Sequence, residues 1–223
     1  MKRTVSMMLI ISLLLSCTLI LTGCNSDKKK IIGSWQAEIN YAAAVNAGLY
    51  AVDDMEKMAD YIAFDSFMLT TTFTFRDDGT YTITLDSLSV FNAVQTIRNH
   101  VAAGMLEYVE DLLKEQNIPL SVNEYLAFLG LNRITLGETL ITDNTLGKMA
   151  EELNKGSSGL YRVKDGKIYM TASTEEALTE ENYDTYTLDG DTLTFLECHC
   201  QLEEGFESIN QEMYPIILTR TEE

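Results

Sequence analysis

The chain is poor in the residues on which catalysis and metal binding most often depend. Its two histidines, His100 and His199, lie far apart in the sequence. Their spacing therefore assembles neither a Ser–His–Asp arrangement nor a metalloprotease helix. Phosphate-cradling loops and nucleophile elbows are also missing from the sequence. We predict a protein that is not an enzyme and that uses no cofactor and no metal ion.

Cysteine and basic residues are scarce as well. Of the four cysteines, Cys17 and Cys24 precede the body of the chain, which excludes a small disulfide-rich scaffold. The 16 basic residues face 34 acidic ones, so the formal net charge is −18. This sign of charge excludes nucleic acid as a partner. We expect the densest acidic run, residues 176–184, to form a solvated face. With 46% hydrophobic residues, the chain can bury one core.

The first residues have the pattern of an export signal. Lys2 and Arg3 precede an apolar run from Val5 to Leu21, and Gly23 follows it. Serines dilute the run, which disfavours a permanent span of about 20 apolar residues. The length of the run and its small-residue exit are typical of a secretory signal. We predict that residues 1–23 are a signal peptide and are removed.

The four residues LTGC, Leu21 to Cys24, resemble the lipobox of bacterial lipoproteins. The resemblance implies that Cys24 is acylated and becomes the first residue of a protein anchored by its lipid chains. Residues 24–30 then form a tether, in which the six residues after the cysteine span at most about 20 Å. We predict export across the cytoplasmic membrane and anchoring to its outer face, or to an outer membrane where the cell has one.

Three segments have the pattern of a β-hairpin, in which two alternating strands flank an acidic-glycine turn. The turns read RDDGT, KDGK and DGDT. Further strands are expected at residues 31–39 and 214–220, which brings the count to eight. Eight antiparallel strands can close into a barrel that holds packed side chains or one small ligand. We predict a mainly β fold with α insertions (α+β), an eight-stranded antiparallel meander or barrel, as one domain over residues 31–223.

Helical patterns interrupt the strands in two places. Apolar residues at spacings of three and four predict a first helical insertion over residues 41–63. A second insertion, residues 87–157, lies between the third and fourth strands and contains a long helix over 90–113. Ser121 and Glu124 have the spacing of a capping box, which predicts another helix start. We expect these helices to pack on the barrel or on one another.

The triplet GSW, Gly33 to Trp35, stands on the first strand directly after the tether. It resembles the Gly-x-Trp signature of lipocalins and lipocalin-like bacterial lipoproteins, and the likeness extends over the strand regions. The resemblance implies that Trp35 closes one end of the barrel and that Arg220 lies across its ring. Such a contact contributes on the order of 1 kcal/mol. Gly33, Trp35 and Arg220 would then be structural residues, whereas the long second insertion departs from the family.

The sequence is compatible with two functions. In the first, the barrel interior binds a small, largely apolar ligand, and helices 41–63 and 90–113 form a lid. The lining residues would be the large side chains of the inner face, namely Phe73, Phe75, Tyr81, Ile83, Tyr161, Phe195 and Ile216. In the second, the barrel is a scaffold, and the helical insertion presents a surface that binds a protein partner.

The run ECHC near the chain end has two interpretations. A regular strand would turn Glu197 and His199 inward, which is costly for a carboxylate without a partner. A bulge near Leu196 would instead turn the cysteines inward and leave Glu197 and His199 in solvent, and we favour this interpretation. A disulfide between Cys198 and Cys200 is disfavoured, because an extended chain separates their Cα atoms by about 6.5 Å.

Overall fold

The computed structural model describes residues 27–50, 58–199 and 213–221. Its eight strands form a closed antiparallel barrel, in which each strand pairs with its neighbours in sequence and β1 pairs with β8. The predicted fold class is therefore confirmed and is consistent with a lipocalin-like α+β barrel. The strands are β1 (Gly33–Asn40), β2 (Met68–Phe75), β3 (Thr80–Leu85), β4 (Ser157–Lys164), β5 (Lys167–Met170), β6 (Tyr183–Asp189), β7 (Thr192–His199) and β8 (Ile216–Arg220).

Helices occur in both predicted insertions. Between β1 and β2 lie α2 (Ala42–Tyr50) and α3 (Ala59–Ile62), and between β3 and β4 lie α4 (Ser87–Glu115), α5 (Val122–Phe128), α6 (Arg133–Leu140) and α7 (Asp143–Lys155). The predicted capping box of Ser121 and Glu124 is present at α5. Helix α6 was not predicted. It begins after Asn132, whose side chain accepts hydrogen bonds from the next turn.

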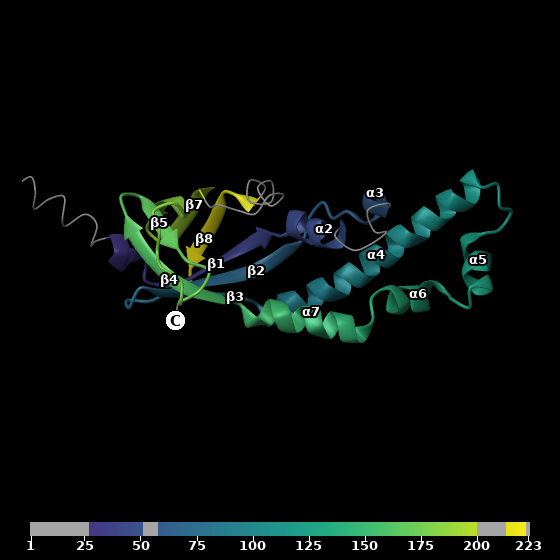
Figure 1. Ribbon diagram of the computed structural model, residues 1–223, viewed down its shortest axis with the longest axis horizontal. Helices are drawn as coiled ribbons and strands as arrows, with labels where there is room; N and C mark the ends of the chain where they lie inside the picture. The colour runs from purple at the N-terminus through teal and green to yellow at the C-terminus, as the bar shows by residue number, and fades with distance from the viewer. Residues whose placement is uncertain (1–26, 51–57, 200–212, 222–223) are drawn as a thin grey trace, which may run out of the picture.

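The two ends of the barrel differ. At one end, which we call the mouth, Asn40 pairs with Met68 and the helices leave the barrel. At the other, which we call the tether end, Gly33 pairs with Phe75, and the three hairpin turns lie there with residues 27–31 (Figure 1). The Lys28 side chain donates a hydrogen bond to the Asp77 carbonyl, at 2.8 Å. The chain thus enters the barrel from the tether end.

Helices α4 to α7, residues 87–155, form an arm that extends from the mouth (Figure 1). Helix α4 packs on α3, α6 and α7, and its first turn contacts β2, where Ser89 accepts a hydrogen bond from the Thr70 amide. A Cβ at Gly104 would collide with the Tyr61 carbonyl, so glycine permits the close approach of α3. The arm extends from the mouth instead of covering it, which corrects the lid predicted for residues 90–113.

Candidate functional site

A single tryptophan closes the tether end. Trp35 is fully buried, and its indole N–H donates a hydrogen bond to the Ile31 carbonyl at 2.6 Å. The Arg220 guanidinium lies 4.1 Å from the centroid of the Trp35 ring, as the lipocalin resemblance implied. Gly33 has φ +122°, and a Cβ there would lie 2.8 Å from Arg220 Nη1. Gly33 therefore makes room for the arginine that covers the tryptophan.

Aromatic rings fill the barrel interior on the mouth side of Trp35. The Phe73 ring lies 5.7 Å from Phe195, and the Phe75 ring lies 5.0 Å from Tyr161, both edge to face. Phe75 and Phe195 are each 1% exposed. A void that could hold water would leave part of such a ring accessible, so the rings pack directly on one another. These four predicted lining residues form a solid floor, and this corrects their assignment to a cavity wall.

The other three predicted lining residues, Tyr81, Ile83 and Ile216, belong to the same core. Tyr81 and Ile216 are buried, and Ile83 is half-buried. Ile83 lies near the mouth, because it pairs with Ser157 at the start of β4. Ile83 is therefore the least buried of the seven predicted lining residues.

Three tyrosines that belong to the barrel core or pack against it have polar partners for their hydroxyls. Tyr81 donates to the Thr171 carbonyl at 2.7 Å, and Tyr214 donates to Asp184 Oδ1 at 2.6 Å. The Tyr41 hydroxyl shares a 3.1 Å hydrogen bond with the hydroxyl of Thr71, a buried residue of β2. Burial raises the pKa of Tyr81 and of Tyr41. A few fixed polar groups in an apolar wall are typical of small-molecule sites.

Asp184 on β6 is the most unusual residue of the mouth. It is 3% exposed, and its strand neighbours are Ile168 on β5 and Cys198 on β7. Burial raises the pKa of Asp184 from 3.8 to about 6, whereas the hydrogen bond from Tyr214 and the nearby His199 act in the opposite direction. Burial and the Asp184 carboxylate in turn raise the pKa of Tyr214. The prediction of a solvated face over residues 176–184 is wrong at this position.

A signal for Asp184 was present in the sequence. Tyr186 and Leu188 mark the inward face of β6, and both pack on the barrel core. Counting back by two along the strand places residue 184 on the same face. Tyr214 stands two residues before the inward Ile216 and packs against the barrel core. The composition of the acidic run concealed this pattern.

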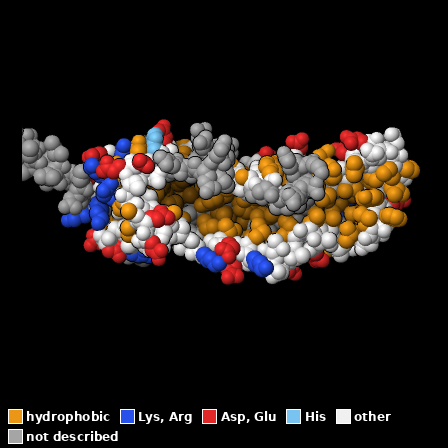
Figure 2. All heavy atoms as spheres, viewed as in Figure 1, with side chains coloured by type: hydrophobic (Ala, Val, Ile, Leu, Met, Phe, Trp, Pro, Cys, Tyr) orange, Lys and Arg blue, Asp and Glu red, His pale blue; other side chains and the backbone are white. Residues whose placement is uncertain are grey.

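Hydrophobic side chains at the mouth are only half-buried. Figure 2 shows such side chains gathered where the barrel meets the arm. Tyr41 packs on both the barrel core and the helical core. The half-buried side chains that pack on the barrel core at this end are Tyr41, Ile83, Met170, Met213 and Tyr214.

The ECHC run adopts the bulged form. Tyr186 pairs with Phe195, and Thr185 pairs with Glu197, so Leu196 is the extra residue. Glu197 and His199 are exposed and Cys198 is half-buried, which confirms the favoured interpretation for these residues. Within the described ranges, no group of three His, Cys, Asp or Glu side chains could hold a metal ion.

Cys198 is disulfide-bonded. Cys200 lies outside the described residues, so the expectation against a bridge between Cys198 and Cys200 stays a prediction.

No protein-family model, curated protein or solved structure matches the chain.

Cys24 and the signal segment lie outside the described residues, so lipidation stays a prediction. In the part of the chain that the structure covers, none of the helices has the length and apolar character needed to cross a membrane.

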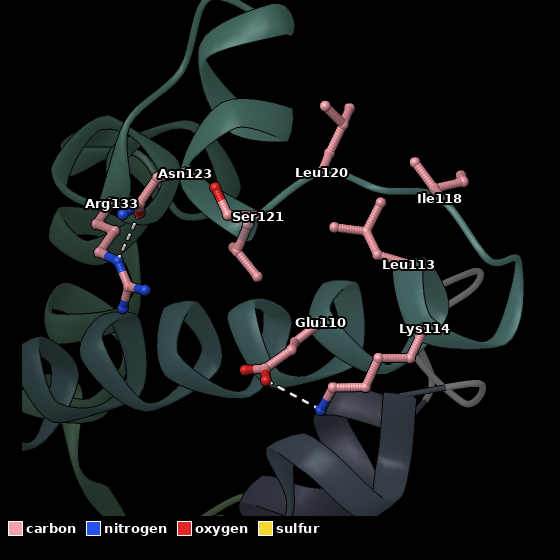
Figure 3. A pocket seen from close by; sticks show the side chains of 9 residues that line it. Glu110, Leu113, Lys114, Ile118, Leu120, Ser121, Asn123 and Arg133 are labelled. Carbon is pink, nitrogen blue, oxygen red and sulfur yellow. Dashed lines mark hydrogen bonds and ion pairs between the residues drawn. The ribbon is translucent and has the colours of Figure 1, made fainter.

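A recess lies at the far end of the arm, between the end of α4 and the start of α5 (Figure 3). It has a volume of about 350 Å³. Its charged side chains face polar neighbours: Lys114 pairs with Glu110 at 2.9 Å, and Arg133 donates to Asn123 at 3.0 Å. The remaining lining residues are Leu113, Ile118, Leu120, Ser121 and Val122.

Proposed function

We propose that the protein is a lipid-anchored, extracytoplasmic binding protein that takes one small, largely apolar ligand at the barrel mouth. The observation that supports this proposal is the combination of half-buried apolar side chains with two hydrogen-bonded tyrosines, Tyr41 and Tyr214, at one end of a closed barrel. Each Å² of apolar ligand surface buried there contributes about 25 cal/mol. The ligand lies above the aromatic floor and not along the whole barrel axis.

The lipid anchor follows from the lipobox resemblance at Leu21 to Cys24. The arrangement of the chain is compatible with it, because residues 27–31 form a helical turn at the tether end. Lipid on Cys24 would hold that end beside the membrane. The mouth and the arm would then point into the extracytoplasmic space, where a dissolved ligand can reach them.

We expect the soluble domain, residues 25–223, to bind the neutral apolar fluorophore N-phenylnaphthylamine saturably, with one molecule per chain. Ile83→Arg, which puts a charge at the mouth, should weaken binding at least about tenfold, or about 1.4 kcal/mol. Ile217→Arg is the matched control, because Ile217 is 61% exposed on the outer face of β8. Fluorescence titration measures the affinities, and circular dichroism verifies folding. Absence of saturable binding in the unaltered domain would contradict the proposal.

The arm supports a second candidate function, which is the binding of a protein partner with an apolar face. Large exposed hydrophobic side chains that form a patch mark interaction sites. Seven large hydrophobic side chains on the arm are exposed, and two of them, Phe128 and Ile134, are 83% and 76% exposed. The others are Leu88, Phe91, Ile118, Leu120 and Leu129.

A photo-crosslinking amino acid at position 128 should form a specific adduct with a protein in the cells that produce the full chain. The same group at position 138, which is exposed and polar on the arm, should form none. Ile134→Ser should remove the adduct while it changes the free energy of unfolding by no more than about 0.5 kcal/mol. Equal labelling from both positions would count against a binding surface on the arm.

A further inference from the structure

Among the residues that the structure describes, one carboxylate, Asp184, is buried in the barrel wall. Among the described residues, the buried polar side chains are Thr71, Thr171 and Asp184, and only Asp184 can carry a charge. Its hydrogen-bond partner is the neutral hydroxyl of Tyr214. No lysine or arginine in the described ranges lies within 4.0 Å of its carboxylate.

The groups around Asp184 do not supply a compensating charge from the interior. Ile168 faces it from β5, and the disulfide-bonded Cys198 faces it from β7. Tyr81 on β3 and Tyr214 before β8 are phenols whose pKa the Asp184 charge raises. His199, a base in the described part of the chain that acts on Asp184, is exposed on β7. A buried carboxylate without a cation costs several kcal/mol in an apolar environment.

We propose that the ligand of the mouth is an amphipathic cation, a primary amine on an apolar body, whose ammonium group pairs with Asp184. This inference rests on the proposed binding function and names the class of its ligand. The Tyr214 hydroxyl donates to Asp184 and keeps oxygen lone pairs that can accept a hydrogen bond from the same ammonium. The apolar body of the ligand contacts the half-buried side chains of the mouth.

The charge of the whole molecule favours the same ligand class. Removal of Lys2 and Arg3 with the signal leaves 14 basic and 34 acidic residues, a formal charge of −20. Such a field attracts cations and raises their rate of encounter. It repels fatty acids and other anionic amphiphiles of the same size.

The test compares decylamine with decanol, which carry the same alkyl chain, by calorimetric titration of the soluble domain near neutral pH. We expect the amine to bind at least about tenfold tighter than the alcohol. Asp184→Asn should abolish that difference. Asp189→Asn is the matched control, because it removes the same charge from an exposed position of the same strand, and it should keep the preference.

The outcomes separate the two proposals. If the two probes bind equally and Asp184→Asn changes neither affinity, the cationic ligand class is overturned and the apolar binding function stands. If neither probe binds, both proposals fall. If Asp189→Asn removes the preference as well as Asp184→Asn, the overall charge and not the pairing with Asp184 selects the amine, and the inference is overturned.

Discussion

Replacing Asp184 with asparagine should stabilise the protein by about 2 kcal/mol near neutral pH. The carboxylate is 3% exposed, and burial raises its pKa from 3.8 to about 6. Above that pH the folded state holds a desolvated charge that the unfolded state exposes to water. An asparagine oxygen can still accept the hydrogen bond from Tyr214, whereas its buried amide group reduces part of the gain.

The stability gained through Asp184→Asn should increase as the pH rises. Because the folded pKa of Asp184 is raised, the folded state binds its proton more tightly than the unfolded state does. The stability that the protonated form contributes is fully present below pH 3.8 and is lost as the pH rises through about 6. The advantage of Asp184→Asn should therefore be near zero below pH 3.8 and reach its full size above about pH 7.

Urea unfolding followed by circular dichroism, at a series of pH values, measures this difference. The two proteins differ at position 184 alone, so the comparison isolates Asp184. Asp189→Asn on the same strand is exposed and should change stability by no more than about 0.5 kcal/mol. A variant at position 184 that is no more stable than the unaltered domain at neutral pH would mean that the carboxylate is not destabilising. Stabilisation together with loss of the amine preference would show a residue kept for binding at a cost in stability.

Trp35→Ala should destabilise the barrel by about 3–5 kcal/mol, the usual cost of removing a large aromatic side chain from a core. Trp35 is fully buried at the tether end, where it bonds to the Ile31 carbonyl and carries Arg220 across its ring. The substitution removes the plug and leaves the guanidinium without its aromatic partner. It also removes the side-chain contact between Trp35 and Arg220, which are paired across β1 and β8.

Urea unfolding measures the loss, and circular dichroism is the appropriate signal because Trp35 is the only tryptophan of the chain. Trp35→Phe is the matched variant. It keeps a ring beneath Arg220 and loses the indole hydrogen bond to Ile31, so we expect a loss of about 1–2 kcal/mol. If Trp35→Ala lowered the free energy of unfolding by less than about 1 kcal/mol, the stability of the tether end would not depend on Trp35.

The strands of this protein could be predicted because side-chain alternation records them directly. Phe73, Phe75 and Tyr81 read as one face around the RDDGT turn, and the structure places all three inside the barrel. The Trp35–Arg220 contact was available through a resemblance, although the two residues are far apart in the chain. The capping box at Ser121 was readable because its signal is local.

Other features depend on contacts that no local pattern records. The aromatic floor forms only when β2, β4 and β7 bring Phe75, Tyr161 and Phe195 together, so the sequence could not distinguish a hollow barrel from a filled one. Helix α6 has no apolar stripe of its own and lies against α4, where a Cβ at Gly137 would contact Ala102. The burial of Asp184 is hidden by the acidic composition of residues 176–184, although strand alternation places this residue on the inward face.

The opposite placement of the mouth and the tether end determines how a cargo could load. With Cys24 lipidated as proposed, the face of the barrel nearest the bilayer is the one that Trp35 and Arg220 close. A molecule dissolved in that bilayer would have no straight path into the protein. The ligand would enter from the aqueous side, past the base of the arm. The anchor would fix the location of the protein at the membrane, and the bilayer would not be the source of the ligand.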